Sequence, residues 1–146
     1  MIGNNVLDLI GNTPMVRINK LTGKKDATIL AKLERFNPGG SVKDRMAKYM
    51  VEQLEKQGKL KKDKIILEAT SGNTGISLAM ISAVKGYKAT LVMSEDVTYE
   101  RRAQIEALGA EIILTPKEKG EAGAIEFAEK LFQENPEKYF MLDQFN

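Results

Sequence analysis

Cysteine, histidine and tryptophan are all absent from this sequence of 146 residues. Without cysteine the chain can form no disulfide and offers no thiolate as a nucleophile or metal ligand. Without histidine it lacks the commonest general base and metal ligand. We therefore expect no metal site, and any catalysis must rest on lysine, carboxylates, hydroxyls or a bound cofactor.

Long apolar runs and a marked charge excess are also lacking. The longest apolar stretch, residues 76–84, has nine residues including two serines, which is too short to span a membrane. The 22 basic and 20 acidic side chains leave a net charge of +2, so no large basic field favours nucleic acid or an anionic membrane. The lysines of residues 56–64 predict a solvated surface. We expect a soluble, cytoplasmic protein with neither kind of partner.

Strand and helix patterns alternate along most of the chain. Strands are predicted at 64–69, 89–93, 110–115 and 139–145, and helices at 76–85, 99–108 and 122–134. A further helix is expected over about 42–57, after two half-buried strands at 14–19 and 27–34. Short connections between alternating elements favour parallel strands joined by right-handed crossovers. The predicted fold class is therefore α/β, an open, mostly parallel twisted sheet with helices on both faces.

Lys43 is the first residue that stands out chemically. It follows the break N-P-G-G-S at 37–41, and Ser41 with Asp44 resembles a capping box at the start of a helix. A cation near the positive end of a helix dipole is disfavoured, and such violations mark functional positions. A lysine that attacks an aldehyde is one such function. The alternative is a solvated lysine on an amphipathic helix.

The turn T-S-G-N-T-G at 70–75 is the second candidate. It lies between a predicted strand and an apolar helix, where glycines, hydroxyls and the N–H groups of a helix start suit an anion, a carboxylate or a phosphate. It is neither a Walker loop nor a dinucleotide fingerprint. A structural helix cap and a nucleotide-binding domain are the alternatives. A shared site requires the turn to face the same cleft as Lys43.

The third candidate is Gln144, within D-Q-F-N at the end of the last predicted strand. Its amide can both donate to and accept from a carboxylate or an amide. A polar strand end without function explains the same pattern.

Five motifs together resemble the cysteine synthase (O-acetylserine sulfhydrylase) family, within the fold-type II pyridoxal-phosphate enzymes that include cystathionine β-synthase. They occur in order over the whole chain: I-G-N-T-P-M-V at 10–16, K-x-E-x-x-N-P-G-G-S-V-K-D-R at 32–45, T-S-G-N-T-G at 70–75, E-R-R at 100–102 and D-Q-F at 143–145. Ser94 departs from the pattern, because a proline is usual there, and this should loosen the following turn.

The resemblance implies a role for each matching residue. Lys43 would bond the aldehyde of pyridoxal 5′-phosphate and move substrate protons, and Asn73 would hydrogen-bond the 3′-oxygen of the pyridine ring. The α-carboxylate of the substrate would be held by Thr70, Ser71, Gly72 and Thr74, with help from Gln144. The implied reaction is β-replacement on O-acetylserine, or a related activated serine, with sulfide to give L-cysteine.

Family members are roughly twice as long as this chain, so it resembles their N-terminal part. Residues 1–40 would then hold strands that pack with a C-terminal domain, and residues 41–146 a small α/β domain. No second Gly/Thr-rich loop is present to hold the cofactor phosphate, so we expect the 146 residues alone to be inactive. The resemblance also implies a homodimer and serine acetyltransferase as a candidate partner. Cystathionine β-synthase activity, another sulfur donor, and a non-catalytic domain that does not retain the cofactor remain open.

Overall fold

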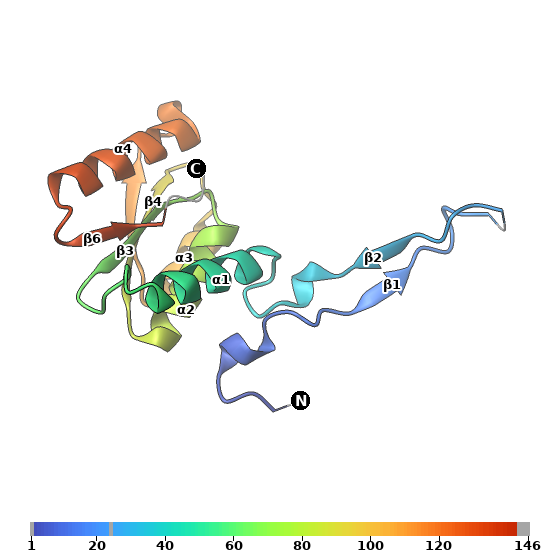
Figure 1. Cartoon of the computed structure of the whole chain (residues 1–146). Coiled ribbons are helices and arrows are strands. Elements are labelled where there is room, and N and C mark those ends of the chain that lie inside the picture. Colours follow the sequence, from blue (N-terminus) through green and yellow to red (C-terminus); the bar gives the residue numbers. More distant parts are fainter. Residues whose placement is uncertain (1, 24, 143–146) are drawn as a thin grey trace.

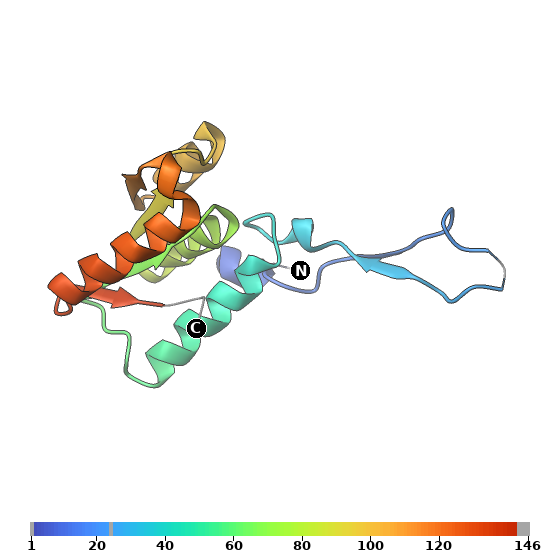
Figure 2. The ribbon, with the colours of Figure 1, turned by 90° about the horizontal axis from the view of Figure 1, so that it is seen from above.

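The computed structural model describes residues 2–23 and 25–142 and shows two parts, a compact α/β body and a projecting arm (Figure 1). Strands β1 (Met15–Arg17) and β2 (Leu30–Lys32) pair antiparallel in the arm, with Val16 opposite Ala31. We call the described residues between 14 and 33 the arm. It extends well away from the body in both ribbon views (Figure 2).

The body is built on four parallel strands in the order β5-β4-β3-β6. These are β3 (Ile65–Ala69), β4 (Lys88–Ser94), β5 (Glu111–Thr115) and β6 (Tyr139–Met141). Six of the seven β4 residues are buried, as expected for a central strand covered on both faces. The predicted parallel α/β sheet is confirmed.

Helices cover both faces of this sheet. Helices α2 (Asn73–Lys85) and α3 (Tyr99–Ala107) pack on one face, and α1 (Lys43–Lys56) packs on α2. Helix α4 (Gly120–Glu134) covers the other face (Figure 2). Alternate residues of the strands face the two helix layers. Ile66 and Leu91 pack in the hydrophobic cluster under α2, whereas Leu67 and Val92 pack in the cluster under α4. Three 3₁₀ turns complete the elements: η1 (Val6–Leu9), η2 (Glu34–Phe36) and η3 (Lys117–Lys119).

The two strands of the arm differ from the prediction. Half-buried strands were expected at 14–19 and 27–34, but β1 is exposed at all three positions and β2 at two of three. Met15 and Leu30 are each 55% exposed. The prediction of burial from alternation is wrong for this chain, because within residues 2–23 and 25–142 the strands β1 and β2 pair only with each other.

Two helix starts also differ from expectation. The second helix begins at Asn73 rather than at residue 76, so half of the T-S-G-N-T-G turn is its first turn. The capping box at Ser41 and Asp44 is wrong. The Asp44 carboxylate accepts from the N–H of Gly39 at 2.6 Å instead of returning to Ser41, and the Ser41 hydroxyl accepts from the N–H of Lys43 at 3.2 Å. The last strand ends at Met141, and residues 143–145 of its predicted range lie outside the described residues.

The far ends of α1 and α2 are joined by a polar cluster around Glu55. Its carboxylate accepts from Lys85 Nζ at 2.7 Å and from the Tyr87 hydroxyl at 3.0 Å. Burial alone would raise the pKa of Glu55, but these hydrogen bonds outweigh it and hold the pKa below its usual value. Burial, together with the bond to Glu55, raises the pKa of Tyr87 to about 12. This cluster fixes the end of the helix pair that lies away from the Gly-rich turn.

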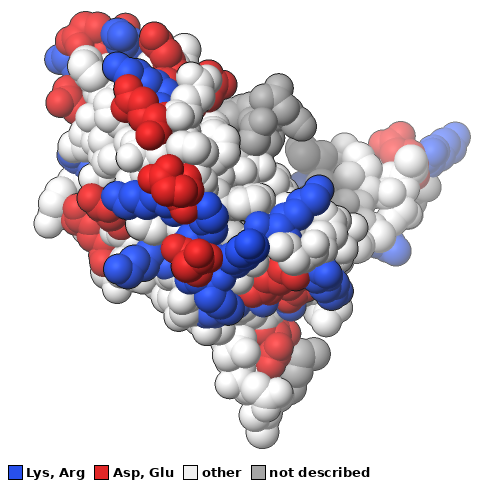
Figure 3. Space-filling view, turned by 60° about the vertical axis from the view of Figure 1, so that its left-hand side comes forward, with Lys and Arg blue, Asp and Glu red and all other residues white. Residues whose placement is uncertain are grey.

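The surface carries both signs of charge. On the face shown in Figure 3, basic and acidic side chains are interspersed. Two members of the lysine group at 56–64 also have structural contacts, because Lys62 donates to the carbonyl of Lys85 and Lys64 to the carbonyl of Pro136.

Among the described residues, no helix has both the length and the apolar character that crossing a membrane requires.

Candidate active site

The Gly-rich turn lies at the carboxyl end of β3, the edge at which ligands bind in open parallel sheets. Thr70 follows the strand, is 3% exposed, and donates its N–H to the carbonyl of Val92 at 2.9 Å. Its hydroxyl oxygen accepts from the N–H groups of Gly72 at 3.1 Å and Gly75 at 3.2 Å. Thr70 therefore shapes the turn and caps α2 from within, and its hydroxyl keeps its own hydrogen to donate.

Two glycines allow this turn to form. Gly72 has φ of +151°, and a Cβ there would lie 2.9 Å from the Arg101 side chain. At Gly75 a Cβ would lie 2.8 Å from the Thr70 methyl group. The absence of a Cβ at Gly72 lets Arg101 lie against the turn, where it donates to the carbonyl of Ser71 at 3.1 Å, and the absence of a Cβ at Gly75 lets α2 pack against Thr70. The turn thus has a guanidinium on one side and the positive end of α2 on the other.

Lys43 and the turn share one cleft. Its volume is about 260 Å³, and it is lined by Lys43, Thr70, Ser71, Asn73, Thr74, Arg101 and Glu121. The expected convergence of Lys43 and Asn73 is therefore confirmed, although they come from the starts of different helices. A second cavity of about 210 Å³ adjoins it and shares four of these residues, continuing toward Ser94 and Asp96.

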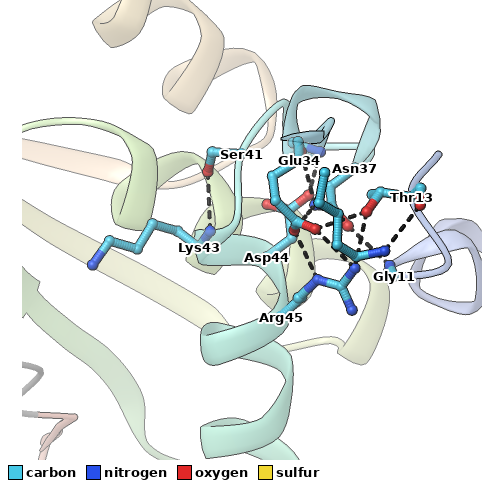
Figure 4. Close-up of polar contacts among 10 residues, drawn as sticks. Gly11, Thr13, Glu34, Asn37, Ser41, Lys43, Asp44 and Arg45 are labelled. Atoms are coloured by element: carbon cyan, nitrogen blue, oxygen red, sulfur yellow. Dashed lines mark hydrogen bonds and ion pairs between the residues drawn. The ribbon is translucent and has the colours of Figure 1, made fainter. Parts of the chain in front are cut away.

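The start of α1 aims neighbouring side chains in different directions. Successive helical residues are rotated by about 100°, so Lys43 and the two residues after it face different surroundings. Figure 4 shows the Lys43 side chain extending away from the polar cluster, which Asp44 and Arg45 enter. Lys43 is half-buried and Asp44 is fully buried.

Arg45 belongs to a network that we call the clasp: Gly11, Thr13, Glu34, Asn37 and Arg45. Arg45 Nε donates to Glu34 Oε2 at 2.7 Å, and its Nη2 donates to Glu34 Oε1 at 3.0 Å. The Thr13 hydroxyl donates to Glu34 Oε1 at 2.7 Å. The bond from Arg45, followed by that from Thr13, lowers the pKa of Glu34 from 4.5 to about 2. The clasp joins the base of the arm to the start of α1 (Figure 4).

Asn37 completes the clasp at the N-P-G-G-S break. Asn37 is 3% exposed. Its side-chain Nδ2 donates to Glu34 Oε2 at 2.8 Å, and its side-chain Oδ1 accepts from the N–H of Gly11 at 2.9 Å. Sequence reasoning placed these residues in motifs but did not assign them a structural role. A signal was present, since an acid, an amide and an arginine at 34, 37 and 45 bracket the lysine turn.

Most of the predicted site residues meet at this edge of the sheet. Lys43, Thr70, Ser71, Asn73 and Thr74 line the cleft, whereas Gly72 is buried within the turn. Gln144 lies outside the described residues. No group of three or more metal-ligating side chains occurs in residues 2–23 and 25–142.

The donor set fits part of a pyridoxal-phosphate site. The cleft brings a primary amine, a side-chain amide and hydroxyls to the N-terminus of α2, which suits an aldehyde-bearing ring together with a carboxylate. Gly72, with φ of +151°, lets the Arg101 guanidinium approach the turn and adds a positive charge beside it. Within this cleft Lys43 would hold the aldehyde end, and the turn would hold an anionic group.

A parallel α/β sheet with a lysine and a Gly-rich turn at its carboxyl edge defines a class of cofactor-dependent enzyme domains. The chain belongs to the family described as pyridoxal-phosphate dependent enzymes, whose model matches residues 6–146. Pyridoxal 5′-phosphate is the cofactor that this membership implies.

Known cysteine synthases are similar to the chain in both sequence and structure. A cysteine synthase of Flavobacterium sp. is 56% identical over 135 residues, covering 92% of this chain and 44% of that protein. Cysteine synthase B of Pseudomonas aeruginosa is 49% identical over 140 residues, covering 96% and 46%. The crystal structure of cysteine synthase (OASS) from Entamoeba histolytica superposes with a TM-score of 0.94 at 46% identity, covering 100% of this chain and 44% of that one. The chain thus spans less than half the length of these relatives.

Proposed function

We propose that these residues are the N-terminal part of a cysteine synthase, which exchanges the acetoxy group of O-acetylserine for the sulfur of sulfide and releases acetate. The observation that carries the proposal is the single cleft that holds Lys43 and the turn at 70–74. Similarity to cysteine synthases at 49–56% identity supports this activity over others in the family.

Each site residue predicted from the sequence has a proposed task. Lys43 Nζ would hold the cofactor aldehyde, and as a free amine it would take the proton from the α-carbon of the substrate. The Asn73 amide donates to the oxygen on the pyridine ring. The substrate carboxylate lies on the turn of Thr70, Ser71, Gly72 and Thr74, where the hydroxyl hydrogens and the end of α2 neutralise it. We also assign Gln144 to this carboxylate.

Pyridoxal phosphate supplies an aldehyde for the amino group and a ring that accepts the electrons released at the α-carbon. The protein contributes position and charge. Arg101 and the positive end of α2 favour an anionic substrate beside the turn, and the half-buried Lys43 side chain reaches the same space. No histidine or cysteine is needed for this division of labour.

We further propose that residues 1–40 pack against a second domain and that residues 41–146 form the small domain. The apolar side chains exposed on both strands of the arm support this division. We also propose a homodimer, serine acetyltransferase as a candidate partner and a cytoplasmic location, as the resemblance to the cysteine synthase family implies. Light scattering, co-purification with the acetyltransferase, and cell fractionation test these three points.

Replacement of Lys43 tests the function. In the full-length protein, Lys43→Ala should lower turnover of O-acetylserine and sulfide by at least about 10³-fold, as expected when a covalent amine is removed, with an unchanged melting temperature. Lys56→Ala is the matched control, because Lys56 is an exposed lysine on the same helix. Borohydride should fix the cofactor onto the Lys43 peptide of the native protein. Full activity of Lys43→Ala would refute the assignment.

The choice of acceptor is tested in the same assay. Sulfide, thiosulfate and homocysteine are offered to the full-length protein with O-acetylserine. Faster turnover with homocysteine would assign cystathionine β-synthase activity instead. A protein that retains no cofactor, and shows no visible absorbance, would support the non-catalytic reading.

A further inference from the structure

Asp44 is a charged side chain with 0% exposure, directly after Lys43 in α1. Its Oδ2 accepts from the N–H of Gly39 at 2.6 Å, and its Oδ1 accepts from the hydroxyl of Ser77 in α2. Ser77 is also fully buried. A buried carboxylate is costly unless it is hydrogen-bonded, and both oxygens of Asp44 have protein donors.

These bonds join three segments that must be in register for the cleft to exist. Gly39 belongs to the break before α1, Asp44 to the first turn of α1, and Ser77 to the second turn of α2. The Ser77 oxygen also lies 3.0 Å from the carbonyl oxygen of Asn73. One carboxylate therefore connects the backbone before Lys43 with Ser77, which lies one turn after Asn73 in α2.

The backbone of the break at 39–41 lies directly against the Asp44 carboxylate. A Cβ on Gly39 would collide with Asp44 Oδ1, and its distances to Asp44 Cγ and Oδ2 would both be 3.0 Å. Gly40, the next residue, has φ of +82° and would meet nothing within 4 Å. The two glycines thus serve different needs. Gly39 provides the space for Asp44, and Gly40 provides the backbone conformation.

Holding α1 on α2 does not by itself require Asp44. Ala47 and Val51 are fully buried in the cluster that includes α2, and the Glu55 cluster ties the far ends of both helices. A buried charge is weak evidence for stability, because desolvation offsets much of its attraction. A charge-assisted hydrogen bond does fix direction and distance. Because Asp44 lies directly beside Lys43, its hydrogen bonds serve to place the lysine more than to stabilise the fold.

We propose that Asp44 is a positioning residue that holds Lys43 against the Asn73 turn, an inference that rests on the proposed function. With Asp44 in place, α1 is fixed on α2 and the amine of Lys43 is held within reach of the reacting carbon. Loss of its bonds lets α1 shift on α2 by a fraction of an ångström to an ångström. A misplacement of that size costs up to about 100-fold in rate.

The test compares both ends of the helix pair in the full-length protein. Asp44→Ala, Asp44→Asn and Ser77→Ala alter the end beside the cleft, whereas Glu55→Gln alters the far end. Asp63→Asn, at an exposed position, controls for charge. Two rates are measured for each variant: capture of pyridoxal phosphate by apoprotein at Lys43, followed by visible absorbance and fixed with borohydride, and turnover of O-acetylserine. Melting temperature is recorded in parallel.

Asp44→Ala should slow capture and kcat by about 10- to 100-fold, with KM for O-acetylserine within about threefold. Asp44→Asn should recover part of the loss, because an amide oxygen can still accept from Gly39. Ser77→Ala should cause a smaller loss of the same kind. Glu55→Gln should lower the melting temperature but leave both rates within about twofold, as should Asp63→Asn.

The proposal is overturned if Glu55→Gln and Asp44→Asn lose the same stability and also slow capture equally. It is overturned too if Asp44→Ala captures the cofactor at the native rate. If Asp44→Ala does not fold, Ser77→Ala decides, because it removes a single hydroxyl. A native protein that captures the cofactor at Lys43 but does not convert O-acetylserine refutes the proposed function, while the capture rates still decide the role of Asp44. No capture at Lys43 by the native protein refutes both.

Discussion

The body and the arm are both built from strands rich in apolar residues, yet only the body buries them. Six of seven β4 residues are buried between α2 and α4, whereas all three β1 residues are exposed. A two-stranded hairpin is at best marginally stable in water by itself. The difference shows that an apolar strand sequence does not by itself ensure burial. Burial depends on whether another layer is present.

The arm is tied to the body at its base. The clasp joins Thr13 and Glu34, at the ends of the arm, to Arg45 on α1. Asp44, one residue before Arg45, faces α2. Adjacent residues of one helix turn therefore anchor the arm and align the cleft. Breaking either connection separately shows how far the two parts depend on each other.

Core truncation gives the largest expected contrast. Leu91→Ala in β4 should lower the free energy of unfolding by about 2–5 kcal/mol, because Leu91 is fully buried and its loss leaves a cavity. Leu30→Ala in the arm should cost less than about 0.5 kcal/mol in the 146-residue chain, since Leu30 is mostly exposed. Urea denaturation measures both.

The same pair of variants tests the proposed packing of the arm. In the full-length protein Leu30→Ala should cost about 1–3 kcal/mol, as expected if a second domain covers its side chain. A cost that stays below about 0.5 kcal/mol in both proteins would contradict the packing.

The clasp should respond to acid. The pKa of Glu34 is lowered to about 2, so its stabilising contribution is complete above the unfolded value near 4.5 and is lost as the pH falls toward 2. Amide chemical shifts of Gly11 and Asn37 should report the loss in an NMR titration from pH 6 to about pH 2. Glu34→Gln should abolish this transition. A midpoint near 4.5 in the native chain would show that Arg45 does not hold the carboxylate.

Much of the body could be predicted from the sequence, because its signals are local. The strand and helix periods, the left-handed Gly86 after α2 with φ of +73°, and the turn at 70–75 all follow from adjacent residues. Lys43 and Asn73 are expected in one cleft because the resemblance implies that both bind one cofactor, and both line that cleft in the structure.

Contacts between distant residues could not be predicted in this way. Asp44 was read as part of a capping box because residues 41 and 44 have that spacing, and its actual partner Ser77 is 33 residues away. Glu34 and Arg45, 11 residues apart, meet only because the break at 37–41 reverses the chain. The alternation in the arm predicts half-buried strands, and only the resemblance, which implies a second domain packed on them, accounts for their exposure in this chain. A sequence pattern does not show whether a partner layer is present.

Tyr87 provides a smaller test within the body. Tyr87→Phe removes the hydrogen bond to Glu55 and should lower the free energy of unfolding by about 0.5–1.5 kcal/mol. The pKa of Tyr87 is raised to about 12, so its contribution is complete below the unfolded value of 10 and is lost as the pH rises toward 12. Stability of the native protein should therefore fall over that range, and that of Tyr87→Phe should fall less. Equal slopes would contradict the assignment.

Replacement of Ser94 should have the smallest effect of these variants, and it should stabilise the protein where the others destabilise it. Its hydroxyl oxygen is buried at the end of β4 without a hydrogen-bond partner among the described residues. Its backbone needs no help from the side chain, since its carbonyl accepts from the N–H of Val97 at 3.1 Å and closes the following turn. Replacing a buried, unpaired hydroxyl with a methyl group removes a desolvation cost and leaves little empty space. Ser94→Ala should therefore raise the free energy of unfolding by up to about 1 kcal/mol, measured by urea denaturation beside Glu95→Ala, an exposed control in the same turn. A loss of more than about 1 kcal/mol would mean that the hydroxyl has a partner in the folded protein.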